Sequence, residues 1–157
     1  MRYLLDVNAL VALGLAEHEF HEPVARWLRG LASKGTPELA TSSITELGFV
    51  RILVQAPQYG FTVGQACNLL QRMKATRAAN FTFIADSHDI SHLPTWVKTA
   101  KQITDGHLSQ LAQENGALLA TLDTGIFSSR AICRMPMPYC RRSITSPRRF
   151  GNRGFRV

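Results

Sequence analysis

Short apolar runs alternate with helical periodicities along most of the chain, and this alternation constrains the fold more than any other feature. The runs with the length and composition of buried strands are Tyr3–Leu5, Glu38–Thr41, Phe81–Ala85 and Ala117–Leu122. Strands that alternate with helices are typical of α/β proteins with a parallel sheet. We therefore predict a three-layer α/β/α domain around a central sheet of four to five mostly parallel strands.

Helical patterns fill the segments between these runs. The predicted helices are 9–16, 21–34, 43–55, 62–73 and 104–115. Ser43-Ile44-Thr45-Glu46 has the spacing of a capping box, and the helix that it opens is apolar nearly all round. An apolar surface on all sides indicates a central, buried helix.

The net charge of +7 is unevenly distributed. Residues 1–127 contain all 11 acids and 10 of the 18 basic residues, whereas residues 128–157 contain eight arginines and no acid. We therefore predict one folded domain over 1–127 and an atypical, arginine-rich, disordered segment over 128–157. Within that segment, Ala131–Cys133 is the candidate for an abbreviated edge strand.

Two classes of location are disfavoured by the sequence. No apolar run approaches the roughly 18 residues that span a bilayer. The apolar N-terminal stretch is interrupted by Asp6 and Asn8, which argues against an export signal. We expect a cytoplasmic protein without a membrane partner.

Four acids fall where such a fold gathers side chains into one cleft. Asp6 closes the first apolar run and Asp123 closes the last, while Glu46 and Asp105 lie in the first turns of predicted helices. Ligands of open α/β sheets collect outside the carboxyl ends of the strands. Clustered carboxylates repel one another, and a divalent cation is the usual reason to tolerate that cost.

Three of the four acids also have a simpler explanation. Glu46 fits the capping box, Asp105 fits a first turn favoured by the helix dipole, and Asp123 fits a turn before Thr124-Gly125. Asp6 gains nothing evident from packing at the end of a buried strand. Asn8 and Thr121 are polar neighbours placed to orient a carboxylate or a metal-bound water.

Several segments together resemble a known family. The run Leu4–Leu10 resembles the opening motif of PIN domains, and three further matches follow in order: Thr45–Leu47, Thr104–Ala112 and Gly116–Asp123. Order and approximate spacing agree over residues 1–125. In size the chain is most similar to VapC-type toxins of bacterial toxin–antitoxin pairs.

This resemblance implies a PIN-like domain that acts as a metal-dependent endoribonuclease. It implies that Asp6, Glu46 and Asp105 bind Mg²⁺ or Mn²⁺, that Asp123 completes the site, and that the metal activates a water for attack on RNA. The implied partners are a cognate antitoxin, an RNA substrate and a second copy in a homodimer. An acidic cleft needs basic groups at its border, and the candidates are Arg72, Lys74, Arg77, Lys98 and Lys101.

Other interpretations remain open. His88, His92 and His107 lack a tight ligand pattern, which favours structural or surface roles over a zinc site. One functional alternative is an inactive PIN-like module that acts through binding alone. Another is a phosphotransferase with Asp6 as nucleophile, because Asp-x-Asn resembles the haloacid dehalogenase pattern, although Asn8 stands where that chemistry uses an acid.

Overall fold

The computed structural model describes residues 1–123 and 132–135, and within them the strands form one parallel sheet. The order across the sheet is β3-β2-β1-β4-β5. The bounds are β1 (Arg2–Leu5), β2 (Glu38–Ser42), β3 (Asn80–Ile84), β4 (Ala117–Thr121) and β5 (Ile132–Arg134). This arrangement confirms the predicted α/β class and the parallel sheet.

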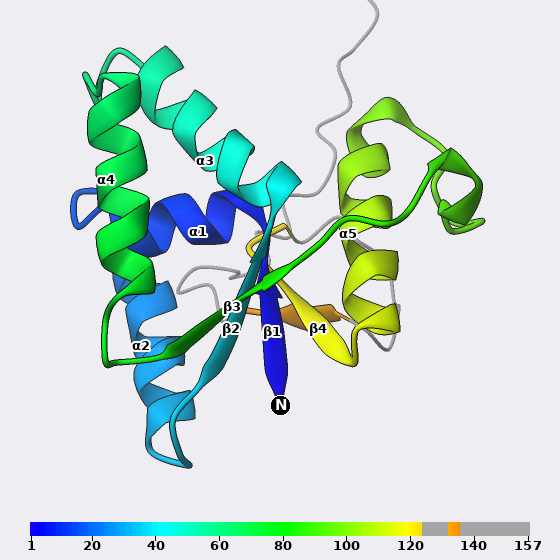
Figure 1. Ribbon diagram of the computed structural model, residues 1–157, viewed down its shortest axis with the longest axis horizontal. Helices are drawn as coiled ribbons and strands as arrows, with labels where there is room; N and C mark the ends of the chain where they lie inside the picture. Colours follow the sequence, from blue (N-terminus) through cyan, green and yellow to red (C-terminus); the bar gives the residue numbers. More distant parts are fainter. Residues whose placement is uncertain (124–131, 136–157) are drawn as a thin grey trace, which may run out of the picture.

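Helices cover both faces of the sheet, as the predicted three-layer architecture requires. They are α1 (Val7–Gly14), α2 (His21–Ala32), α3 (Ser43–Gln55), α4 (Val63–Lys74) and α5 (Ile103–Glu114). Figure 1 shows α1 to α4 on one side of the sheet and α5 on the other. None of the helices within the described residues combines the length and apolarity needed to cross a bilayer.

The central strand supplies side chains to both cores. Leu5 is fully buried with Phe49 and Leu53 in the core beneath α1 to α4. Leu4, equally buried, packs with Leu108 and Leu111 of α5 on the opposite face. Successive side chains of a strand point to opposite faces, so a continuous apolar run in β1 fills both layers.

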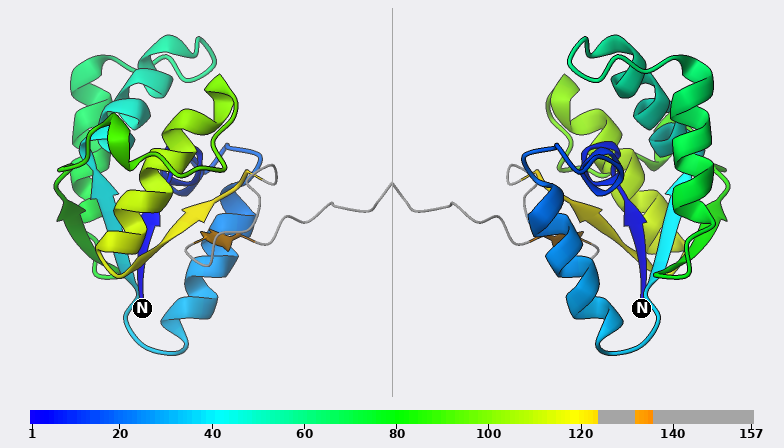
Figure 2. Two further views of the ribbon diagram at one scale, coloured as in Figure 1. Left: turned by 90° about the vertical axis from the view of Figure 1, so that its right-hand side faces the viewer. Right: turned by 90° about the vertical axis from the view of Figure 1, so that its left-hand side faces the viewer.

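The abbreviated edge strand predicted at Ala131–Cys133 is present as β5. It pairs in parallel with β4, where Leu119 lies opposite Ile132, and Met135 just beyond it is buried. Figure 2 shows β5 beside α2, and Trp27 of α2 forms a hydrogen bond with Cys133. The rest of the arginine-rich segment predicted over 128–157 lies outside the described residues.

Two expectations for the helix at residues 43–55 are wrong. Its cap is Ser42, whose side chain accepts from the N–H of Thr45, because β2 extends to Ser42 and moves the start of the capping box back by one residue. The helix is also not buried all round, since Leu47 is 65% exposed and Val54 is 38% exposed. The buried residues of α3 are Thr45, Phe49 and Leu53, which lie at helical spacing on one side of the helix.

The connection from residue 85 to residue 102, where the sequence shows no clear pattern, crosses over α5 with little regular structure. It contains two short 3₁₀ turns, Ile90–His92 and Ala100–Gln102. Gly106 of α5 allows the close approach of this connection, because a Cβ there would lie 2.3 Å from Cγ2 of Val97. The connection therefore leads into α5 directly beside Asp105.

Candidate active site

The sheet changes its direction of growth between β1 and β4. The chain adds β2 and β3 on one side of β1, and then returns to add β4 and β5 on the other. Ligands of open α/β sheets bind outside the carboxyl ends of strands at such a switch. Asp6 directly follows β1, and Asp123 lies just beyond β4, so both acids are at this point as the strand pattern predicts.

The Asp6 carboxylate is buried and held by two donors. The residue caps α1, and its Oδ1 accepts from the backbone N–H of Ala9 at 2.6 Å. Its Oδ2 accepts from the hydroxyl of Thr121. Burial raises the pKa of Asp6 to about 6, and the charges of Asp105 and Asp123 act in the same direction, while the two hydrogen bonds oppose them.

Asp105 and Asp123 share the electrostatic environment of Asp6. Asp105 lies in the first turn of α5 and is partly buried. Its pKa is raised, first by burial and second by the negative charge of Asp123. Three of the four predicted acids, Asp6 after β1, Asp105 on α5 and Asp123 after β4, are therefore near enough for their charges to affect ionisation, and we call them the acidic group.

Thr121 links two members of this group. Its hydroxyl donates to Asp6 and accepts from the backbone N–H of Asp123 at 3.0 Å. The side chain is fully buried, so its orientation is fixed by packing as well as by these bonds. Asn8 is exposed and lines a small cavity of about 310 Å³ together with Asp123.

Glu46 has a different environment. It lies in the first turn of α3, and its Oε1 accepts from the hydroxyl of Thr41 at 2.6 Å. The same oxygen is 2.5 Å from Nζ of Lys74, which also lies 5.6 Å from the ring centroid of Phe83. Glu46 is thus paired with a cation, and it lines a second cavity of about 750 Å³ with Lys74 and Phe83.

A glycine brings α3 close to α1 near this residue. A Cβ at Gly48 would lie 2.6 Å from Cγ2 of Val7, so only glycine permits this approach without a shift. Gly106, the residue after Asp105, allows a similar approach on α5. Gly48 follows Glu46 by two residues and Gly106 follows Asp105 by one, so a glycine after the acid marks both close contacts.

Comparisons with known proteins give a consistent result. Ribonuclease VapC38 of Mycobacterium tuberculosis is 36% identical over 129 residues, which cover 80% of this chain and 87% of the relative. The chain belongs to the VapC family. Ribonuclease VapC44 of the same species is 36% identical over 132 residues, covering 80% and 89%, and ribonuclease VapC39 is 33% identical over 138 residues, covering 82% and 94%. No protein-family model matches the chain.

Three histidines, His88, His92 and His107, join the 85–102 connection and α5. His107 pairs with Asp86 at 2.8 Å, and His88 pairs with Glu114 at 2.6 Å. The rings of His88 and His92 stack with centroids 4.8 Å apart. These pairs hold the 85–102 connection against α5. They join residues that are distant in the sequence, so no local sequence pattern predicts them.

The donor chemistry of the acidic group fits a hard divalent cation. Within residues 1–123 and 132–135, no three His, Cys, Asp or Glu side chains are grouped as they would be around a metal ion. The carboxylates of Asp6, Asp105 and Asp123 nevertheless repel one another enough to contribute to two raised pKa values. Carboxylate oxygens are the ligands that Mg²⁺ and Mn²⁺ prefer, and a cation would relieve this repulsion.

Proposed function

We propose that this chain is a metal-dependent endoribonuclease with a PIN-type domain, and that it is the toxin of a VapBC-type toxin–antitoxin pair. The observation that carries the proposal is the group formed by Asp6, Asp105 and Asp123 at the switch point of the sheet. The M. tuberculosis relatives that cover four-fifths of the chain are named ribonucleases, which supports an RNA substrate.

The residues present have distinct proposed roles. Asp6, Asp105 and Asp123 would hold Mg²⁺ or Mn²⁺, with Glu46 as a further ligand. When bound, the ion would supply a water of lowered pKa and would offset negative charge on the scissile phosphate. The N–H of Ala9 and the hydroxyl of Thr121 orient the Asp6 carboxylate. Thr121 also fixes the backbone at Asp123, so one hydroxyl sets the positions of two acids.

The proposed partners follow from the same family relationship. A cognate antitoxin would restrain the enzyme by covering the acidic cleft, and a cytoplasmic location would give the chain access to both the antitoxin and RNA. We also propose a homodimer, supported by the exposed apolar side chains of Leu47 and Phe83, which are 65% and 51% exposed. Light scattering of the purified chain measures the oligomeric state, and a monomer at all concentrations would contradict the dimer.

The deciding experiment is RNA cleavage by the purified chain with Mg²⁺, with Mn²⁺ and with EDTA. We expect cleavage with either ion, none with EDTA, and none from Asp6→Asn or Asp105→Asn. Both substitutions remove a charge with little change in volume, and circular dichroism checks that the variants fold. Cleavage that persists in EDTA or in both variants would show that the metal mechanism is wrong.

Two further readouts separate the alternatives. RNA binding without cleavage on any substrate tested would favour an inactive binding module. Recovery of phosphate covalently attached to Asp6 would favour a phosphotransferase. Both oxygens of Asp6 accept hydrogen bonds, and the position two residues later is Asn8, so we expect no phosphoenzyme.

A further inference from the structure

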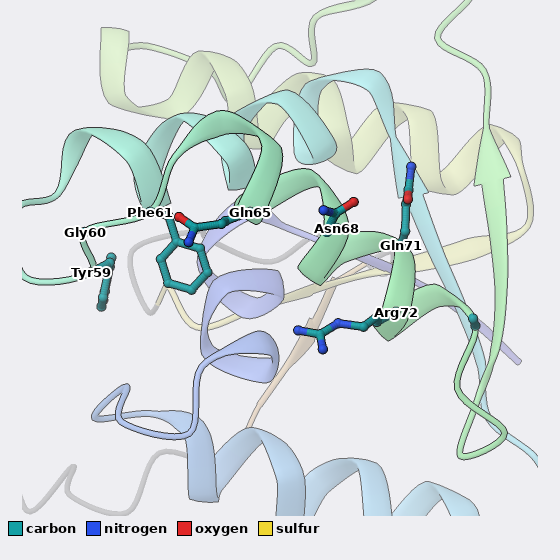
Figure 3. A pocket seen from close by; sticks show the side chains of 8 residues that line it. Tyr59, Gly60, Phe61, Gln65, Asn68, Gln71 and Arg72 are labelled. Carbon is teal, nitrogen blue, oxygen red and sulfur yellow. The ribbon is translucent and has the colours of Figure 1, made fainter.

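The outer face of α4 borders an open cavity of about 900 Å³ whose lining is rich in groups that can bind a ligand. It combines two aromatic rings, three side-chain amides and one guanidinium, which belong to Tyr59, Phe61, Gln65, Asn68, Gln71 and Arg72. Figure 3 shows Tyr59 and Phe61 at one end, Gln71 and Arg72 at the other, and Asn68 between them. From Gln65 to Arg72 the helix rises by about 10 Å.

The chain segment that lines this cavity carries only basic charged residues. Residues 47–85 contain no Asp or Glu, yet they contain four basic residues, Arg51, Arg72, Lys74 and Arg77. Residues 1–127 as a whole have one more acid than they have basic residues. Positive charge is therefore concentrated on α4 and the turn after it, which favours a polyanionic ligand.

The polar groups of the cavity are available to a ligand. Gln65 uses its Oε1 to accept from the N–H of Thr62, which leaves its amide N–H groups free to point outward. Asn68, Gln71 and Arg72 are all exposed. Among the residues that the structure describes, Arg72 forms no ion pair, in contrast to Arg29, which pairs with Glu22 at 2.7 Å.

The two rings are already positioned by the core. Tyr59 and Phe61 are partly buried and pack against the core cluster beneath α1 to α4, so their rings lose little freedom when a ligand binds. Aromatic faces stack with bases, amides bond to base edges, and arginine binds phosphate. A cavity of this size is near the upper end of the usual range for ligand pockets, roughly 300–1,000 Å³.

We propose that this cavity is a binding subsite for single-stranded RNA, with bases on Tyr59 and Phe61 and a phosphate on Arg72. The substrate class rests on the proposed function, whereas the location rests on the cavity itself. Gln71 and Ala75 also line the neighbouring cavity that contains Glu46 and Lys74. The subsite therefore continues toward an acid of the candidate active site and holds a flank of the substrate strand.

The test is binding of a short fluorescein-labelled oligouridylate to the full chain in EDTA, followed by fluorescence anisotropy over a range of salt concentrations. Arg72→Ala should weaken binding and reduce the slope of log K against log salt by about 0.7, the value for one phosphate contact on a single strand. Tyr59→Leu should weaken binding at least about five-fold, as loss of one stacked base does.

Matched controls separate the subsite from general charge and from folding. Arg51→Ala removes an exposed arginine of the same acid-free region outside the cavity and should leave the salt slope unchanged. Tyr59→Phe keeps the ring and should bind as the unmodified chain does. The proposal is overturned if Arg72→Ala and Arg51→Ala have equal effects, or if Tyr59→Leu binds as tightly as Tyr59→Phe while both melt at the same temperature.

The outcome is independent of cleavage. Binding in EDTA that depends on Arg72 and Tyr59, in a chain that never cleaves RNA, would support the subsite and contradict the proposed enzyme. Metal-dependent cleavage together with indifference to both residues would contradict the subsite alone, and would assign the cavity to a protein partner instead of RNA.

Discussion

Asp6 and Glu46 lie near the carboxyl ends of the neighbouring strands β1 and β2, but their carboxylates have different charged neighbours. Each accepts a hydrogen bond from a threonine hydroxyl, Thr121 for Asp6 and Thr41 for Glu46. Glu46 also pairs with Lys74, whereas the ionised neighbours that shift the pKa of Asp6 are two further acids, Asp105 and Asp123.

Under the proposed function, this difference predicts that a bound cation acts at Asp6. The Glu46 region is balanced by a cation of the chain. The Asp6 region has hydrogen bonds to orient its carboxylate, but burial and the neighbouring charges oppose ionisation and raise its pKa to about 6. A ligand that binds only the folded state stabilises it, so a divalent cation at Asp6 would add stability as well as reactivity.

The largest expected effect is on stability as a function of pH. Without metal, folded Asp6 keeps its proton up to about pH 6, while in the unfolded chain it ionises near 3.8. The folded state therefore binds more protons between these values, and the free energy of unfolding falls as pH rises through them. Over this window, ionisation of the buried Asp6 should lower the free energy of unfolding by about 2–3 kcal/mol. Asp6→Asn should remove that loss of stability. Urea unfolding of both proteins in EDTA, at about pH 4 and about pH 7.5, measures the difference.

The matched variant for this comparison is Glu46→Gln. It removes the partner of Lys74, so we expect it to lower the free energy of unfolding at neutral pH, where Asp6→Asn raises it. Opposite signs for the two substitutions would support the contrast between the regions. The same sign and size for both would show that Asp6 is no less balanced than Glu46.

The next effect concerns the two threonines. Thr121→Val removes the hydroxyl that orients Asp6 and the backbone at Asp123, so cleavage should fall by about 10–100-fold, as loss of groups that orient metal ligands does. Thr41→Val should reduce cleavage less than Thr121→Val does, because Lys74 still holds Glu46. Initial rates with saturating Mg²⁺ compare the variants. Thr121→Ser keeps a hydroxyl and should recover most activity, and equal losses from both valine variants would contradict the contrast.

The smallest effect is expected at Lys74. The Lys74 and Glu46 side chains are 30% and 26% exposed, so solvent screens their pair, and Lys74→Gln should lower stability by about 1 kcal/mol or less. The same substitution frees Glu46 for metal, and half-maximal cleavage should need less Mg²⁺. Lys74→Arg keeps the charge and serves as control. A higher Mg²⁺ requirement in Lys74→Gln would show that the lysine supports the metal site instead of competing with it.

Much of the fold follows from local patterns. The apolar runs and helix periodicities predict the strand and helix order, and Thr62 with Gln65 caps α4 as their spacing indicates. The predicted end of the helix over 104–115 is also confirmed, because α5 has Asn115 as its C-cap and the following Gly116 has a φ of 63°. These features depend on residues close together in the chain, so one sequence suffices to find them.

The environment of each acid depends on contacts that local patterns do not encode. The bond between Thr121 and Asp6 joins residues 115 apart, and the pair of Glu46 and Lys74 joins residues 28 apart. The sequence places the acids at strand and helix ends, but the packing of α4 against α3 brings Lys74 to Glu46. The error of one residue in the α3 cap has a similar cause, since pairing with β3 extends β2 to Ser42.

The most direct test of the central claim is calorimetric titration of Mn²⁺ into the unmodified chain and into Asp105→Asn at neutral pH. If Asp6, Asp105 and Asp123 together hold the ion, the unmodified chain binds Mn²⁺ saturably and Asp105→Asn binds it much more weakly, while Lys74→Arg binds it normally. Equal Mn²⁺ affinity in the unmodified chain and in Asp105→Asn would contradict the claim that this acidic group is the metal site.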